Sequence, residues 1–248
     1  MDLATNQGIK VLRAGTSWHG GAHEWSLPTR STDGAWTPGE WTPAVAPSVC
    51  SRGWHLTTEP GRWWSVDAGV TAYLAEWDGA LARREGDEKF AVERCRLLRE
   101  LTADELATFG VFRSGIHEVR AGSAWAYGSA MVTAHGSATV TAHGSATVRA
   151  YGSATVTAYD SATVTAYDSA TVTAHGSATV RAHGSAKAHA AGQSVATAWG
   201  GGVVVTRADR GVIVDRRGDV PRTVCKRNGL DGRRYADGEW VLSARVAE

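Results

Sequence analysis

The sequence is poor in the residues that usually build a large apolar core or a cysteine framework. It has only 3 Phe, 2 Met and 3 Cys among 248 residues. The odd cysteine number, with spacings that fit neither a disulfide framework nor a CxxC motif, predicts reduced thiols in a cytoplasmic protein. No apolar run approaches the roughly 18 residues of a membrane helix. No apolar stretch follows a basic N-terminus either, so we expect neither a membrane span nor a secretory signal.

Charge of either sign is not in excess. The 26 Lys and Arg face 25 Asp and Glu, which leaves a net charge of +1. General nucleic-acid binders are strongly basic, so this balance argues against a nucleic-acid partner. What is present is unevenly spread: 8 of the 11 Trp fall within residues 1–80, whereas residues 121–192 are almost entirely Ala, Thr, Val, Ser, Gly, His and Tyr.

An eight-residue repeat explains the composition of the middle of the chain. Ser recurs every eight residues from Ser129 to Ser185, and Val recurs every eight residues from Val132 to Val180. The consensus is S-A-T-V-T-A-[HY]-[GD]. In A-T-V-T-A, small apolar and polar residues alternate, which predicts a short strand with Ala and Val on one side and Thr on the other. The remaining residues supply a tight corner, because Gly and Asp tolerate unusual backbone angles.

Two repeats are needed to enclose a core, since one octad leaves almost no interior. We therefore predict a parallel β-solenoid with 16 residues per coil and a thin Ala/Val core. Residues 129–192 would hold four coils, about 20 Å long at a strand spacing of about 4.8 Å. His and Tyr would stack along the two corner edges. Both repeat arginines, Arg149 and Arg181, would lie on one face.

The opposite face carries three uninterrupted T-x-T rungs. They are Thr139 and Thr141, Thr155 and Thr157, and Thr171 and Thr173. The octad resembles the repeat of bacterial ice-nucleation proteins, A-G-Y-G-S-T-x-T, as in residues 150–157, over about 70 residues. The order here is shifted, and an extra Ala separates Ser from the first Thr. The resemblance implies an ice- or surface-binding face, whereas β-branched Thr also suits a plain sheet surface.

The ends of the repeat array are degenerate. Residues 116–127 and 195–199 keep parts of the pattern with altered spacing, and we interpret them as covers for exposed strand edges. Trp125 and Trp199 would then close the thin core. Ends that stay uncovered would favour end-to-end stacking into a homo-oligomer or filament.

The N-terminal region predicts a small α+β domain. Strands are expected at residues 9–13, 53–57, 70–76 and 90–98, with a Pro- and Gly-rich loop to about residue 50. Thr102 and Glu105 form a capping-box pattern that would open a helix over residues 104–109. The crowded Trp would mostly form the core, with Trp36 and Trp41 as the best candidates for an exposed stacking surface.

A second resemblance covers residues 8–101. Cys50-Ser51-Arg52-Gly53-Trp54-His55, Pro60, Glu76-Trp77-Asp78-Gly79 and the basic strand from Lys89 are similar to a domain of unknown function from phages and bacteria. That family shows C-x-x-G-[FW]-H and is often followed by octad repeats. This chain departs from it in a longer insert at residues 16–48. The resemblance implies an architecture and supplies no activity.

Two chemical sites deserve comparison with their structural alternatives. Cys50 and His55, with His19 and His23, offer zinc-ligand types, but Gly20-Gly21 and the C-x4-H spacing disfavour that site. A buried Cys and a hydrogen-bonded His are the alternative, so we expect no metal and no cofactor.

The second possible site comprises Arg13, His55, Thr57 and Glu76. Arg13, Thr57 and Glu76 resemble in order the residue types of ADP-ribosyltransferases, although the Thr57–Glu76 spacing is short. Otherwise Glu76 is a strand-end residue. No catalytic residue is assigned, and an enzyme is the less favoured reading.

The C-terminal segment predicts strands at 203–206, 211–214 and 240–242, with Asn-Gly and Asp-Gly turns between them. Its basic residues suit a solvated hairpin face, and we interpret the segment as a cap. The chain is thus expected to be mainly β: an α+β domain at 1–116, a solenoid at 117–200 and a β cap at 201–248.

These features predict a non-enzymatic structural or interaction protein. Its solenoid would act as a spacer or as a self-association surface, with an unidentified protein partner. The alternatives are an ice- or surface-binding solenoid acting through the T-x-T rungs, and an ADP-ribosyltransferase-like enzyme in the N-terminal domain.

Overall fold

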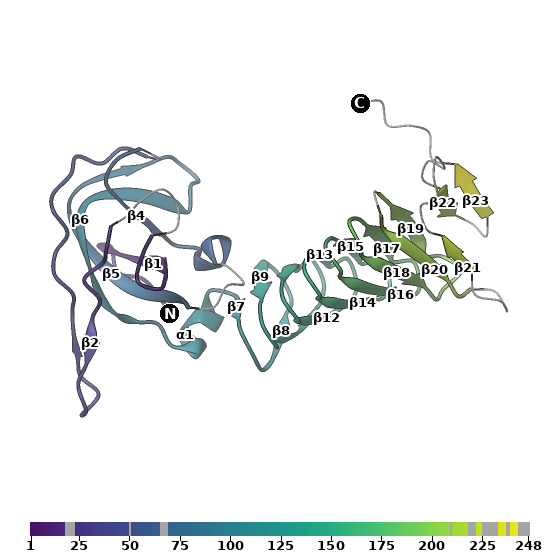
Figure 1. Ribbon diagram of the computed structural model, residues 1–248, viewed down its shortest axis with the longest axis horizontal. Coiled ribbons are helices and arrows are strands. Elements are labelled where there is room, and N and C mark those ends of the chain that lie inside the picture. Colours follow the sequence, from purple (N-terminus) through teal and green to yellow (C-terminus); the bar gives the residue numbers. More distant parts are fainter. Residues whose placement is uncertain are drawn as a thin grey trace. The chain divides into compact units, whose positions relative to one another are not determined.

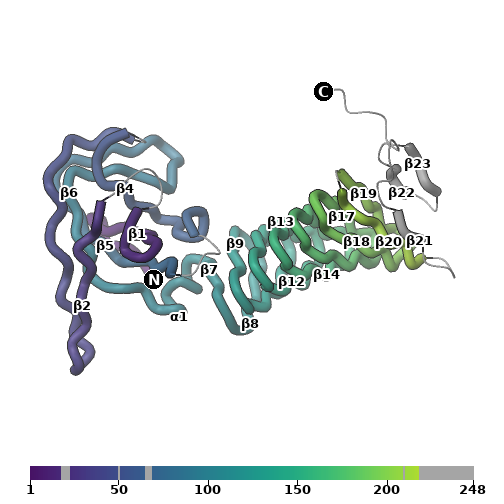
Figure 2. The backbone as a smooth tube through the Cα atoms, in the orientation of Figure 1, coloured from purple at the N-terminus to yellow at the C-terminus, as the bar shows by residue number. Residues whose placement is uncertain are grey.

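The computed structural model describes residues 1–17, 23–49, 51–64, 69–208 and 210–217, together with the backbone of three strands at 222–224, 233–236 and 239–242. The chain divides into two compact units, Met1–Val111 and Phe112–Glu248. Figure 1 and Figure 2 show that each unit has its own β architecture. The two units are considered one at a time.

The first unit is built on a closed barrel of four antiparallel strands in the order β1-β4-β6-β5. The strands are β1 (Gln7–Arg13), β4 (Trp54–Thr57), β5 (Val70–Arg83) and β6 (Lys89–Glu100). They confirm the four predicted strands, and β5 continues well beyond residue 76. Two register shifts in the β5–β6 pairing, at Leu74/Ala75 and Asp78/Leu81, interrupt these long strands. Such bulges bend and twist a strand, which helps a small sheet to close.

Little else in this unit is regular. Short pieces are β2 (Thr29–Arg30), β3 (Trp36–Thr37) and the 3-10 helix η1 (Pro60–Trp63). The one α-helix among the described residues is α1 (Ala103–Thr108). The unit is therefore an antiparallel β structure with very little helix.

The barrel core depends on large side chains. Leu12 and Leu56 are buried together with Trp25, and Trp54 and Trp77 pack against the same cluster. This confirms that most of the described Trp serve as core, in a unit with few Phe. Trp41 is 36% exposed, as expected, and Trp36 is half-buried.

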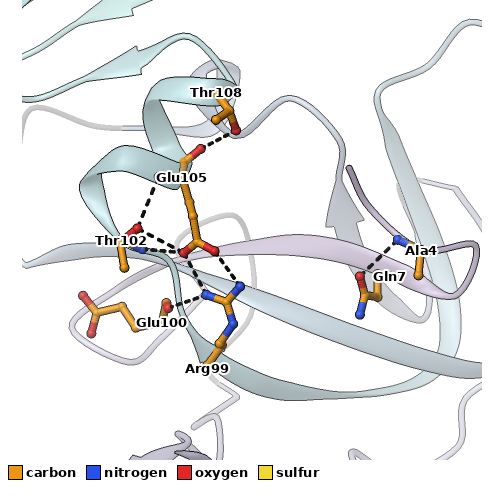
Figure 3. Close-up of polar contacts among 7 residues, drawn as sticks. All are labelled: Ala4, Gln7, Arg99, Glu100, Thr102, Glu105 and Thr108. Atoms are coloured by element: carbon orange, nitrogen blue, oxygen red, sulfur yellow. Dashed lines mark hydrogen bonds and ion pairs between the residues drawn. The ribbon is translucent and has the colours of Figure 1, made fainter. Parts of the chain in front are cut away.

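Helix α1 is fixed at its first turn by two neighbouring residues (Figure 3). The Glu105 amide donates to Thr102 Oγ1 at 3.2 Å, and the Thr102 amide donates to Glu105 Oε2 at 3.0 Å. This is the predicted capping box, and the helix that it opens begins one residue earlier than expected. Arg99 of β6 donates to both Glu105 carboxylate oxygens, at 2.8 and 2.6 Å. These hydrogen bonds lower the pKa of Glu105 to about 2 and hold the helix against the barrel strand.

The second unit is a parallel β-solenoid with two octads per coil, as the repeat predicts. Its strands form an eight-stranded sheet I and a nine-stranded sheet II. The parallel strands of sheet I are β8 (Ile116–Val119), β10 (Met131–Ala134), β12 (Thr147–Ala150), β14 (Thr163–Ala166), β16 (Thr179–Ala182), β18 (Val195–Ala198) and β20 (Val212–Asp215). Those of sheet II after the short β7 (Val111–Phe112) are β9 (Ser123–Ala126), β11 (Thr139–Ala142), β13 (Thr155–Ala158), β15 (Thr171–Ala174), β17 (Lys187–Ala190) and β19 (Val204–Arg207).

Alternation along each short strand sorts the side chains as predicted. In β14, Val164 and Ala166 are fully buried, whereas Thr163 and Thr165 face outward and stay partly exposed. Equivalent residues stack in register, so that Val148 pairs with Val164 and Val164 with Val180. Two closely spaced sheets leave room for Val and Ala alone, which explains the lack of large residues here.

The corners explain why Ser and Gly recur so strictly. Gly136 adopts φ +58°, and Asp160 and Asp168 take the same left-handed conformation at +55° and +54°. The Ser153 hydroxyl donates to the Gly136 carbonyl of the preceding coil at 2.9 Å. The Gly144 amide donates to Asp160 Oδ2 of the next coil at 3.0 Å. Each corner is thus hydrogen-bonded to the coil below it.

The degenerate flanks differ from their predicted role as covers. Strand β8 pairs in parallel with β10, and β18 pairs in the same way with β16 and β20. The flanks are therefore further rungs, and the parallel stack runs on beyond residue 200 into β19 and β20. Single-residue changes in loop length absorb the altered spacing, since Ile116 aligns with Met131 and Val195 with Val212.

The two proposed Trp lids do not cover the core. Trp125 pairs with Thr141 on the outward side of sheet II, and Trp199 stacks at a corner on His183. Phe112, which is buried, instead stacks on His117 at 4.0 Å beside the first rungs.

In the last coil, charged residues take two of the inward positions that Ala occupies in the preceding coils. Arg207 aligns with Ala190 of the inward column, and buried Asp215 aligns with Ala198. Asp215 pairs with Arg217 at 2.7 Å. Strands β21 (Arg222–Val224) and β22 (Arg233–Ala236) then add antiparallel to β20 and β19, and β23 (Glu239–Leu242) pairs with β22.

Candidate functional site

The structure does not gather the four N-terminal candidate residues into one site. Arg13 pairs with Val70 at one end of the β1–β5 ladder, and Glu76 pairs with Gln7 at the other end. These ends are six residue steps apart along β1, about 20 Å at the usual rise. The ADP-ribosyltransferase-like arrangement needs these side chains around one substrate, and the barrel register separates them.

Each of the remaining two candidates has a local structural contact. Thr57 is buried, and its Oγ1 accepts from the Glu59 amide at 3.0 Å. His55 is half-buried, and burial next to the Lys89 and Lys10 ammonium groups lowers its pKa to about 4. His55 is therefore neutral at physiological pH. Glu76, at the far end of the ladder, forms an ion pair with Arg96.

Lys10 is a buried cation beside His55 and Trp25. Its Nζ donates to the His55 carbonyl at 3.2 Å and lies 4.7 Å from the centre of the Trp25 ring. Burial lowers its pKa to about 8. Burial also raises the pKa of the nearby Cys95 thiol to about 12, which leaves that thiol unreactive as a nucleophile.

The zinc hypothesis falls partly outside the described residues, because Cys50 and His19 are not among them. The His23 ring packs 5.4 Å from Trp25 and 4.5 Å from Trp54, so it takes part in an aromatic cluster. Within the described part of the chain, no group of three or more His, Cys, Asp or Glu is arranged to hold a metal ion. In the same part, no helix has the length and apolar character needed to cross a membrane.

Trp41 is exposed but its ring is already in contact with cations. The guanidinium groups of Arg94 and Arg96 lie 5.2 and 5.0 Å from its centre. These arginines also pair with Asp78 and Glu76 on β5. The arrangement links an irregular segment to two barrel strands, which fits a structural role for Trp41.

The six threonines of the T-x-T rungs do come together, on sheet II. Thr139, Thr155 and Thr171 align in one column of exposed side chains. Thr141, Thr157 and Thr173 form a second, half-buried column beside it. The Thr columns end where other residues take the Thr positions. At one end Trp125 pairs with Thr141, and at the other end Lys187 pairs with Thr171.

Sheet I carries a different surface, which we call the arginine column. It consists of the aligned outward residues Thr133, Arg149, Thr165, Arg181 and Thr197. Arg149 and Arg181 are exposed, and neither pairs with a carboxylate among the described residues. The polar contact of Arg149 is with the Met131 sulfur, at 3.7 Å.

Aromatic side chains stack along both edges of the solenoid, as the repeat predicts. On one edge the neighbouring rings lie 4.8 to 5.1 Å apart, in the order Tyr127, His143, Tyr159 and His175. On the other edge the spacing is 4.8 to 6.1 Å, in the order His135, Tyr151, Tyr167, His183 and Trp199. The repeat does not predict Tyr127 and Trp199 as ladder ends, although both follow an Ala in the corner position of a degenerate unit.

His143 lies within one of these ladders, between two tyrosine rings. Burial between Tyr127 and Tyr159 lowers the pKa of His143, and the Asp160 carboxylate 3.7 Å away opposes that shift.

Comparisons of the chain with protein-family models, with curated proteins and with solved structures gave no match.

Proposed function

We propose that this chain is a non-enzymatic structural protein whose solenoid serves as a rigid spacer. The observation that carries the proposal is the unbroken ladder of parallel strands from β8 to β20 and from β9 to β19, around a core of fully buried Val and Ala. In such a stack each coil contacts its neighbours, so length and stiffness follow from the number of coils.

The last coil favours a spacer of fixed length over a filament that grows by stacking. A further apolar coil would have to pack on Arg207 and on the buried Asp215–Arg217 pair. Burying charges under an apolar rung is costly. The antiparallel strands β21 and β22 also occupy the edges of both sheets at this end.

Distance measurements between spin labels test the spacer. Labels at Ser129→Cys and Gln193→Cys, with Cys50 and Cys225 replaced by Ser, sit on exposed corners four coils apart. We expect a narrow distance distribution, with backbone positions about 19 Å apart. Duplicating residues 147–162 inserts one coil and should lengthen the distance by about 4.8 Å. A broad distribution that ignores the insertion would refute the spacer.

A second candidate function is binding to ice or another flat surface through sheet II. It is supported by the alignment of Thr139 with Thr155 and of Thr155 with Thr171, which gives a regular array of hydroxyl and methyl groups. An ice-recrystallisation assay tests it. Inhibition should vanish in a Thr155→Lys variant and persist in Thr163→Lys on sheet I; no inhibition by the unaltered chain would remove this candidate.

A further inference from the structure

The arginine column of sheet I has a charge pattern that the spacer role does not use. Arg149 and Arg181 point away from the core on β12 and β16, and Thr165 of β14 lies between them in strict register. Other repeats have Thr at this position, so packing does not require a cation there. Two exposed guanidinium groups without a carboxylate partner among the described residues are available to an anion.

The surroundings of the column are also favourable to an anion. In sheet I the described outward residues from Met131 to Thr197 include no Asp or Glu. Glu118, one rung earlier, is paired with Arg120 and lies 3.4 Å from His135. The unit from Phe112 to Glu248 as a whole holds 15 Lys and Arg against 10 Asp and Glu.

The spacing of the two arginines narrows the choice of ligand. They stand two rungs apart, about 9.6 Å at the usual strand spacing. A β-linked pyranose in an extended chain is about as long as one rung, so two rungs match one disaccharide. A linear polysaccharide with one carboxylate on every second sugar would place successive carboxylates opposite Arg149 and Arg181.

We propose that the arginine column binds an acidic linear polysaccharide that carries one carboxylate per disaccharide. Each arginine would donate two parallel hydrogen bonds to a carboxylate. Thr165, between them, would hydrogen-bond the intervening neutral sugar. The aligned outward residues form a continuous row across the rungs of sheet I, along which an extended chain can lie.

Nucleic acid is the main competing ligand class. Its phosphates are more closely spaced than the two arginines, and its binding depends on many phosphate contacts. The column offers two cations, flanked by neutral Thr, and its outward residues include no aromatic ring for base stacking. The observations therefore favour the polysaccharide.

The test uses the full chain, with hyaluronan oligosaccharides as the acidic probe and chito-oligosaccharides as the neutral one. Binding is followed by calorimetry at low salt. We expect hyaluronan to bind and the neutral chain not to bind. Arg149→Thr with Arg181→Thr should weaken hyaluronan binding by about tenfold or more, because each lost contact is charge-assisted. Both substitutions introduce the residue that other repeats carry, so the solenoid should remain folded.

Two further variants separate spacing from charge. Arg181→Thr combined with Thr165→Arg keeps the net charge but places the arginines on adjacent rungs, and it should weaken binding as much as the double loss. Lys187→Thr removes a cation from sheet II and should leave the affinity within about twofold. Circular dichroism confirms folding of each variant.

Four results would overturn the proposal. The first two are equal binding of the acidic and neutral sugars, and no binding of either. The third is an unchanged affinity in the spacing variant, and the fourth is tighter binding of an oligo(dT) single strand than of hyaluronan. None of them bears on the spin-label distances, so the spacer and the ligand proposals can fail independently.

Discussion

The two units of this chain both bury one side of a β-sheet, but they do so with side chains of different size. The barrel closes long antiparallel strands around Trp25, Leu12 and Leu56. The solenoid stacks four-residue parallel strands around Val and Ala, all of them fully buried in the regular rungs. The barrel needs contacts between distant residues, such as Ile9 with Leu74, whereas the solenoid repeats one contact between residues 16 apart.

Charge follows the same division. Residues 1–111 hold 11 Lys and Arg against 15 Asp and Glu, whereas residues 112–248 hold 15 against 10. The near-zero total is thus the sum of an acidic barrel unit and a basic solenoid unit. Global charge balance is therefore a weak guide to the partners of a chain with two units.

A charge in the thin core should break the solenoid and leave the barrel folded. Val156→Asp places a carboxylate at a fully buried position between the two sheets. We expect a loss of about 4 kcal/mol or more in the stability of the second unit, seen as a separate early transition in denaturant unfolding. The control, Thr157→Asp, places the same charge outward. Similar midpoints for both variants would contradict the assignment of inward and outward sides.

Truncating a buried side chain to Ala should lower the free energy of unfolding more in the barrel than in the solenoid. Leu56→Ala leaves a cavity among rings and should cost about 3 kcal/mol. Val164→Ala should cost about 1.5 kcal/mol, since two buried methyl groups are lost. Ala196 already occupies this column, and Ala188 occupies the equivalent column of sheet II, which shows that the core tolerates Ala there. Equal losses, measured by denaturant titration, would show that side-chain size is not what distinguishes the two cores.

The helix at the end of the barrel unit should depend on one carboxylate. Glu105→Gln removes the ion pair with Arg99, while its amide oxygen can still accept from the Thr102 amide, and it should lower stability by about 1 kcal/mol at neutral pH. The folded pKa of Glu105, about 2, lies below its ordinary value of 4.5. Its contribution is therefore complete above pH 4.5 and is lost as the pH falls toward 2.

Unfolding measured across that pH range checks this prediction. The difference between Glu105→Gln and the unaltered chain should shrink as the pH falls. A constant difference would contradict the role of the ionised carboxylate.

The smallest expected effect concerns the aromatic ladders of the solenoid. The folded pKa of His143 lies below its ordinary 6.5, so protonation opposes folding and stability should decline slightly as the pH falls below 6.5. His143→Tyr introduces the residue used by other repeats at this position and should remove that decline. The comparison is made on the solenoid transition alone, because His55 of the barrel also has a lowered pKa. A pH response that persists in the variant would assign it to another group.

Much of the fold could be predicted because its causes are local. The octad period, the alternation in A-T-V-T-A and the left-handed corners at Asp160 and Asp168 all act within one or two repeats. The capping box of Thr102 and Glu105 is equally local. The degenerate flanks were misjudged because backbone pairing tolerates a loop that is one residue shorter or longer, and tolerates Trp125 in an outward position.

Candidate sites were harder to predict, because they depend on which strands become neighbours. Arg13, Thr57 and Glu76 share a plausible order in the sequence, yet β1 runs antiparallel to β5 and places Arg13 and Glu76 at opposite ends. In contrast, the separation of Arg149 and Arg181 followed from the repeat, since their sequence distance is a whole number of coils. Their lack of a carboxylate partner among the described residues required the three-dimensional arrangement.

The sequence by itself determined the coil length, the inward and outward sides of each rung and the aromatic edges, because a strict period repeats one local structure. The tertiary structure alone decided the barrel closure, the ends of the stack and the charged last coil. These depend on pairings between segments that share no period, and only the folded backbone specifies which of them meet.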